Sequence, residues 1–176
     1  IVAFLSFAPQ TNAAIIEYVA TDLADTTPGQ DLWRYDYSVS GRTFLQTQFV
    51  DIYFNPARFS NLTAGPNPNA DWDVAVLQQP NPANFPPFDV GILDLFALSN
   101  NPSLTGLFSV TFVYLGGGAP GSQNFDVFDS AGSVLASSVT TEASSVVPEP
   151  SALLPLGVLL PWLAFRANAR SRATRK

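Results

Sequence analysis

The stretch "DLWRYDYSVS", residues 31–40, decides the fold of this chain. Large apolar residues alternate in it with polar ones, and successive side chains of a β-strand point to opposite faces. One face would carry Trp33, Tyr35, Tyr37 and Val39, and the other face Arg34, Asp36 and Ser38. The alternation predicts a half-buried strand, because one face suits a core and the other suits water.

The same period of two residues recurs along the body of the chain. It is clear in "QFVDIYF" (48–54), "DWDVAVL" (71–77) and "LFSVTFVY" (107–114), and shorter apolar runs cover residues 15–20, 92–98, 125–128 and 134–139. Turns rich in glycine and proline separate these runs, and no segment of the body shows a sustained helical period. The pattern predicts an all-β fold, an antiparallel β-sandwich of about eight strands that is immunoglobulin-like or jelly-roll-like, with the alternating aromatic residues in its core.

The composition removes several kinds of chemistry. Cysteine, histidine and methionine do not occur in the 176 residues, so disulfides, thiol nucleophiles, histidine general bases and His/Cys zinc sites are excluded. Charge is divided unevenly: up to Glu149, three arginines against 14 acidic residues give −11, and the remaining residues carry +5. An acidic body repels phosphates, so no nucleic acid partner is expected.

The first 14 residues, "IVAFLSFAPQTNAA", are predicted to be the remnant of a secretory signal peptide. They are apolar as far as Ala8, break at Pro9 and end in small residues that suit a cleavage site. The alternative is that this stretch is a first strand of the fold. On the preferred interpretation, residues 15–141 form the sandwich domain and residues 142–147 a linker.

Residues 151–165 near the other end are uncharged and mostly apolar. As a helix they would span about 22 Å, against about 30 Å of bilayer hydrocarbon, which predicts a short transmembrane helix. A basic tail follows and would stay in the cytoplasm, which places the body outside. The membrane segment comprises Ser151, Leu153, Leu154, Leu156, Val158, Leu159, Leu160, Trp162, Leu163 and Phe165, and the basic tail comprises Arg166, Arg170, Arg172, Arg175 and Lys176.

Immediately before this segment stands Pro148, Glu149 and Pro150. A Pro-Glu-Pro motif, then a short apolar segment, then a basic end closely resembles the PEP-CTERM sorting signal of Gram-negative bacteria. The resemblance covers residues 148–176 and implies cleavage near the motif by an exosortase, with the chain held in the inner membrane before processing. It also implies export to the cell surface or extracellular matrix and an association with exopolysaccharide. The stretches "WRYDYSVSG", "DIYFNP" and "GAPGSQNFDVFDSAGSVL" are similar, less specifically, to globular parts of PEP-CTERM proteins, and imply no activity.

A glycine pattern in the body matches a nucleotide-binding fingerprint by its letters alone. Gly116, Gly118 and Gly121 have the spacing of the dinucleotide motif, which requires a helix directly after the glycines. Here Pro120 interrupts the pattern and the next residues read as a strand. A loop is therefore expected, and no nucleotide cofactor.

A weak calcium candidate lies in "NPNADWD", where Asn67, Asn69, Asp71 and Asp73 are spaced two residues apart. Their oxygens could converge on Ca²⁺ if the loop curls, although the stretch lacks the glycine and glutamate of an EF-hand. The alternative is that they are solvated turn residues leading into a strand.

Three further patterns in the sequence bear on function. Carboxylate pairs could hydrolyse glycosides, and the pairs by sequence are Asp71 with Asp73, Asp89 with Asp94, and Asp126 with Asp129. Trp72, Phe85 and Phe88 could stack on sugar rings, although core packing or loop anchoring is the preferred role. Residues 61–63, "NLT", fit an N-glycosylation sequon that means little in a bacterium.

These features together predict a secreted, surface- or matrix-sorted protein with a structural or adhesive role and no enzymatic activity, associated with exopolysaccharide or biofilm. The alternatives are an extracellular carbohydrate-binding module, a surface hydrolase that uses carboxylates, and a protein that keeps its membrane anchor permanently.

Overall fold

The computed structural model describes residues 13–77 and 91–144. The Pro-Glu-Pro motif, the predicted membrane segment and the basic tail lie outside the described residues, as do Phe85, Phe88, Asp89 and all but the last two residues of the predicted signal remnant.

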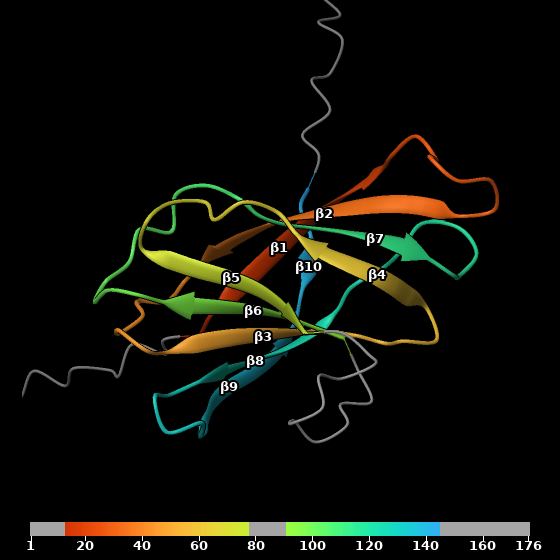
Figure 1. The fold of residues 1–176 in the computed structure, drawn as a ribbon. Coiled ribbons are helices and arrows are strands. Elements are labelled where there is room, and N and C mark those ends of the chain that lie inside the picture. Colours follow the sequence, from red (N-terminus) through yellow and green to blue (C-terminus); the bar gives the residue numbers. More distant parts are fainter. Residues whose placement is uncertain (1–12, 78–90, 145–176) are drawn as a thin grey trace, which may run out of the picture. The chain divides into compact units, whose positions relative to one another are not determined.

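Ten strands form two five-stranded sheets that pack face to face as a sandwich (Figure 1). The first sheet has the order β10, β1, β2, β7, β4, and the second has the order β5, β6, β3, β8, β9. The strands are β1 (Ile15–Asp22), β2 (Asp31–Ser40), β3 (Phe49–Phe54), β4 (Phe59–Ala64), β5 (Trp72–Leu77), β6 (Gly91–Ala97), β7 (Phe108–Tyr114), β8 (Asn124–Phe128), β9 (Val134–Val139) and β10 (Thr141–Glu142). The predicted β-sandwich is thus confirmed, and the eight predicted runs all form strands.

The alternation in β2 buries the predicted face. Tyr35, Tyr37 and Val39 are buried and Trp33 is half-buried, and the strand lies between β1 and β7 with antiparallel pairing on both sides. A central strand presents one side to the opposite sheet over most of its length, which is why the signal in the sequence is strongest here.

Two strands were not predicted. In β4 the pairing with β7 shifts between Ser60 and Thr63, and Asn61 within this β-bulge has a positive φ of 54°. A bulge breaks the two-residue period, so the alternation that reveals the other strands is lost. The other strand, β10, is only two residues long and pairs in parallel with Glu17 and Tyr18 of β1.

Aromatic side chains dominate the core between the sheets. Tyr35 lies at the centre of one cluster, with ring contacts to Tyr18, Phe54, Phe59 and Phe112 at centroid separations of 4.9 to 6.5 Å. Burial of each such ring stabilises the fold by about 1.5 to 3 kcal/mol, and this is the main term available to a domain without disulfides. The predicted role of the alternating aromatic residues is confirmed.

All regular structure in the described residues is strand or turn. Within them, no helix is long and apolar enough to cross a membrane.

Candidate functional site

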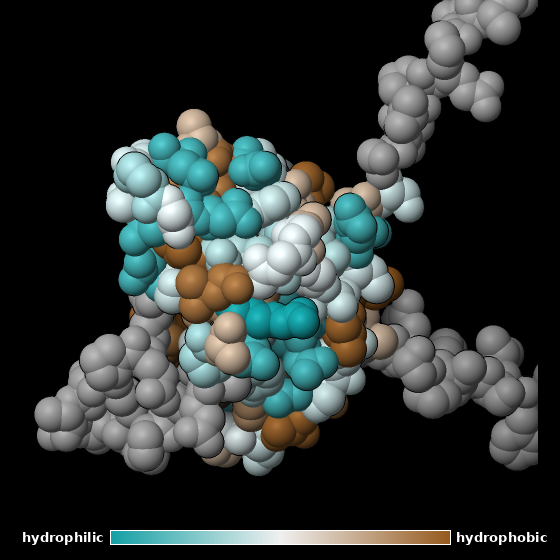
Figure 2. All heavy atoms as spheres, turned by 90° about the vertical axis from the view of Figure 1, so that its right-hand side faces the viewer, coloured by the Kyte–Doolittle hydropathy of each residue, from teal (hydrophilic) through white to brown (hydrophobic). Residues whose placement is uncertain are grey.

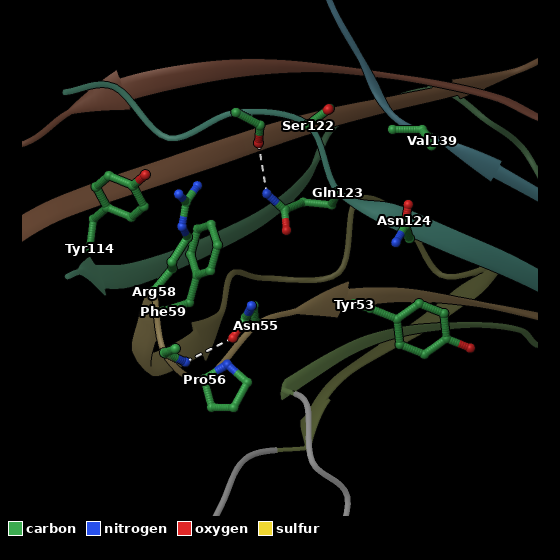
Figure 3. Close-up of a pocket in the computed structure, with 12 residues that line it drawn as sticks. Tyr53, Asn55, Pro56, Arg58, Phe59, Tyr114, Ser122, Gln123, Asn124 and Val139 are labelled. Atoms are coloured by element: carbon green, nitrogen blue, oxygen red, sulfur yellow. Dashed lines mark hydrogen bonds between the residues drawn. The ribbon is translucent and has the colours of Figure 1, made fainter. Parts of the chain in front are cut away.

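A polar groove lies at the end of the sandwich where the β3–β4 turn faces the β7–β8 loop. It consists of a cavity of about 780 Å³ and a second of about 420 Å³. Tyr53, Asn124 and Val139 line both cavities, so the two hollows adjoin along β3, β8 and β9. Figure 3 shows the residues that line the larger one. Figure 2 shows this end of the domain, where hydrophilic and near-neutral side chains surround small apolar patches.

One wall of the larger cavity is the β3–β4 turn, residues 55–58. The Asn55 carbonyl accepts hydrogen bonds from the backbone N–H groups of Arg58 and Phe59, both at 2.9 Å, and Asn55 Oδ1 accepts one from Ala57 N at 2.9 Å. These bonds close the turn and fix the orientation of the Asn55 amide. Its Nδ2 consequently points into the cavity, as Figure 3 shows.

The opposite wall is the segment of residues 121–123, which is tied to the core. Tyr35 donates from its hydroxyl to the Gly121 carbonyl at 2.6 Å, and Gln123 donates from Nε2 to the same oxygen at 2.7 Å. Gln123 N donates to Thr140 Oγ1 and accepts in return through its carbonyl from Thr140 N. Gln123 and Thr140 are both buried. The wall is therefore rigid at its base, with Ser122 and Asn124 exposed on either side of Gln123.

Gly116 shapes a third part of the cavity. A Cβ placed on Gly116 would overlap the ring and hydroxyl of Tyr114, which is buried and lines the cavity. The absence of a side chain at residue 116 thus lets Tyr114 lie where it does. By contrast, a Cβ on the neighbouring Gly117 would meet nothing within 4 Å.

Tyr53 connects the groove to a row of aspartates on the outer face of the second sheet. Asp94, Asp51 and Asp126 lie directly opposite one another on β6, β3 and β8. Tyr53 donates from its hydroxyl to Asp126 Oδ2 at 2.9 Å. Asp51 Oδ1 and Asp94 Oδ1 are buried and have no hydrogen-bond partner among the described residues. Carboxylates opposite each other on neighbouring strands repel when both are ionised.

Burial raises the pKa of two carboxyl groups of this row, Asp51 and Asp94. Burial and the charges of Asp94 and Asp126 raise the pKa of Asp51 to about 7. Burial and the charge of Asp73 raise the pKa of Asp94 to about 6. Burial and the hydrogen bond to Asp126 raise the pKa of the Tyr53 hydroxyl, which stays protonated as the donor. Near neutral pH Asp51 is thus partly protonated, and a carboxyl that holds a proton can act as an acid.

Phenylalanines flank the aspartate row on the same face. Phe96, Phe49 and Phe128 are paired across β6, β3 and β8, with stacked rings at centroid separations of 6.4 and 4.8 Å. The three rings are half-buried. Each ring is two residues along its strand from one of the aspartates, and apolar neighbours of a carboxyl group favour its neutral form.

Three of the four residues of the weak calcium candidate accept hydrogen bonds from the protein itself. Asn67 Oδ1 accepts from Val74 N, Asn69 Oδ1 accepts from Asp71 N, and the Asp71 carboxylate accepts from Ser99 Oγ and Ser103 N. Asp73 is exposed, on the outer face of β5. The oxygens brace the loop before β5, and no group of three or more acidic side chains that could hold a metal ion occurs within residues 13–77 and 91–144.

Two of the three predicted carboxylate pairs have separate surroundings in the fold, and Asp89 of the third pair lies outside the described residues. Asp71 and Asp73 have the separate surroundings just described, and Asp129 accepts hydrogen bonds from Ala131 N and Ser133 N within the β8–β9 turn. Asp94 and Asp126 instead belong to the row centred on Asp51.

Trp72 and the three glycines of the nucleotide-binding pattern have roles in the fold. Trp72 is fully buried and donates from Nε1 to the Ser103 carbonyl at 2.8 Å, so it is a core residue and not a platform for sugars. Gly116, Gly118 and Gly121 lie in the β7–β8 loop and lead into strand β8, so the helix that a dinucleotide site needs does not follow them.

The groove residues Tyr53, Asn55, Arg58 and Asn124, and the central Asp51, were missed from the sequence. One signal was present: Asp51, Asp94 and Asp126 each stand between two apolar residues of a strand. Such positions lie on the outer face, but only the register shows that the three are neighbours.

In comparisons with protein-family models, curated proteins and solved structures, no match to this chain was found.

Proposed function

We propose that this chain is an exported protein that is sorted to the cell surface or extracellular matrix and binds exopolysaccharide there through the groove around Tyr53. Its role is structural or adhesive. The observation that carries the binding proposal is the joining of two cavities by Tyr53, Asn124 and Val139 into one extended, polar hollow. An open hollow lined by amides, hydroxyls and a tyrosine ring suits a polymer that offers hydroxyl groups along its length.

The sorting proposal is supported by the C-terminal pattern. Pro148, Glu149 and Pro150 would be recognised by an exosortase, while residues 151–165 would hold the chain in the inner membrane as a short transmembrane helix. The intact mass of the protein from surface, medium and inner-membrane fractions tests this. A mature form that ends near residues 148–150 supports processing, whereas retention of residues 151–176 in every fraction supports a permanent anchor.

The binding proposal is tested by sedimentation of the full chain with exopolysaccharide from its host. Tyr53→Ala removes the ring and hydroxyl shared by both cavities and is expected to weaken binding at least tenfold. The control is Leu98→Ala, which removes an exposed side chain that lines neither cavity. Equal affinities of the wild type and Tyr53→Ala would contradict the assignment of the groove.

A surface hydrolase is the second candidate, because the row holds carboxyl groups with raised pKa values beside the groove. Hydrolysis needs an acid and a base or nucleophile on either side of the bond. We expect no release of reducing ends when the protein is incubated with the polysaccharide. Release that disappears in Asp51→Asn would instead assign catalysis to the row.

A further inference from the structure

The larger cavity presents positive charge on an otherwise acidic domain. Its lining contains one arginine, Arg58, and no acidic residue. The chain up to Glu149 carries only two other arginines, Arg34 and Arg42, against 14 acidic residues. A cation at the edge of a hollow, without a carboxylate in the lining, favours an anionic group of the ligand.

Arg58 is available for such a group. Its side chain is exposed and forms no ion pair or hydrogen bond with any described residue. Arg34 differs, because its Nε lies 2.9 Å from Asp36 Oδ2 in an ion pair. The Arg58 backbone is nevertheless fixed, since Arg58 N donates to the Asn55 carbonyl and the Arg58 carbonyl accepts from Leu115 N at 2.8 Å. The guanidinium is thus free on a rigid base.

Asn55 supplies a second donor from the same turn. The bond from Ala57 N to Asn55 Oδ1 occupies the oxygen of the amide, so Nδ2 is the group left for a ligand. Figure 3 shows this nitrogen turned into the cavity and the Arg58 guanidinium projecting toward the wall that contains Ser122 and Gln123. A guanidinium and an amide N–H₂ on one side of a hollow can donate to the two oxygens of a carboxylate.

We propose that the larger cavity is a carboxylate subsite, formed by Arg58 and Asn55, and that the polysaccharide bound by this domain contains uronic acid units. This inference rests on the proposed function, because it names the class of polymer that the groove accepts. Charge-assisted hydrogen bonds from an arginine are about twice as strong as neutral ones, so Arg58 would contribute strongly to affinity.

The smaller cavity places a limit on the charge of the polymer. Asp126 lines it, and its carboxylate accepts a hydrogen bond from the Tyr53 hydroxyl. A second ligand carboxylate beside Asp126 would be repelled, whereas a sugar hydroxyl could donate to it. The unit in the smaller cavity is therefore uncharged, and the preferred polymer has acidic and neutral portions rather than a carboxylate on every unit.

The experiment measures binding of the full chain to partly methyl-esterified polygalacturonate, to the fully esterified polymer and to dextran, at low salt. We expect the partly esterified polymer to bind at least tenfold more tightly than the other two, with an affinity that falls as salt is added. Arg58→Gln should remove that advantage. Arg34→Gln, which removes the same charge away from the groove, should retain it.

The outcomes separate this inference from the proposed function. Equal binding of the partly and fully esterified polymers, or an unchanged preference in Arg58→Gln, would overturn the carboxylate subsite and leave the groove as a neutral sugar site. Binding of polyglutamate as tight as that of the uronate polymer would also overturn it, since the site would then recognise charge alone. If no polysaccharide binds, including that of the host, the proposed function itself fails.

Discussion

The Tyr53 hydroxyl donates a hydrogen bond of 2.9 Å to Asp126 Oδ2, across two neighbouring strands of the second sheet. This bond joins the two parts of the candidate site. Tyr53 lines both cavities, whereas Asp126 lines the smaller one and ends the row of carboxyl groups centred on Asp51. The row and the groove thus meet at the Tyr53 hydroxyl.

Two buried tyrosines on β2 should respond oppositely to loss of their hydroxyl groups. Tyr35→Phe removes the bond to the Gly121 carbonyl and should lower the free energy of unfolding by about 1 kcal/mol. The Tyr37 hydroxyl is buried without a partner among the described residues, so Tyr37→Phe should leave stability unchanged or raise it. Urea unfolding of both variants checks this, and a larger loss for Tyr37→Phe would contradict the described hydrogen bonding.

Adjacent glycines in the β7–β8 loop should differ in their tolerance of alanine. Gly116→Ala pushes Tyr114 out of its position and is expected to cost about 1 to 3 kcal/mol and to weaken polysaccharide binding. Gly117→Ala meets no atom and serves as the matched control, with stability and binding like those of the wild type. Thermal melts and sedimentation with polysaccharide measure both effects. Equal behaviour of the two variants would show that Tyr114 is not held by Gly116.

The stability of the domain should depend on pH through the protonation of Asp51. Its pKa of about 7 in the folded protein lies above the value of about 3.9 of an unfolded chain. Between these two pH values the folded state therefore binds more protons than the unfolded state. The contribution of this carboxyl to the free energy of unfolding is complete below about pH 4 and is lost as the pH rises to about 7. The melting temperature should fall by a few degrees over this range, because solvent screens part of the effect.

Asp51→Asn provides the test of this assignment. The amide stays neutral, so the variant should lose part of the pH dependence and melt at a higher temperature than the wild type at pH 8. Asp22→Asn, which changes an exposed aspartate of β1, is the control and should keep the pH dependence of the wild type. If the melting temperature of Asp51→Asn changed with pH as much as that of the wild type, the titrating group would be a residue other than Asp51.

The sandwich could be predicted because burial imposes the two-residue period. Strands such as β2, β3 and β7 are buried on one face along most of their length, so their composition records that face. In β4 the bulge at Asn61 interrupts the alternation of buried and exposed residues, and β10 is too short to show a period.

The groove and the aspartate row could not be predicted in the same way. Asp51, Asp94 and Asp126 are far apart in the chain and become neighbours only through the pairing of β6, β3 and β8. The groove depends on how the turn at Asn55 faces the loop that ends at Gln123. The position of that loop is set by the hydrogen bond from the Tyr35 hydroxyl to the Gly121 carbonyl and by the bond from Gln123 N to Thr140 Oγ1. Such contacts leave no pattern in a single sequence.

The central claim, that the groove binds polysaccharide, is tested most directly by hydrogen–deuterium exchange of the full chain with and without the exopolysaccharide of its host. The account predicts slower exchange in two segments, residues 53–59 and 115–124, with residues 99–107 at the other end of the sandwich unchanged. Exchange that stays the same in both segments while the polymer is bound, or that slows only elsewhere, would contradict it.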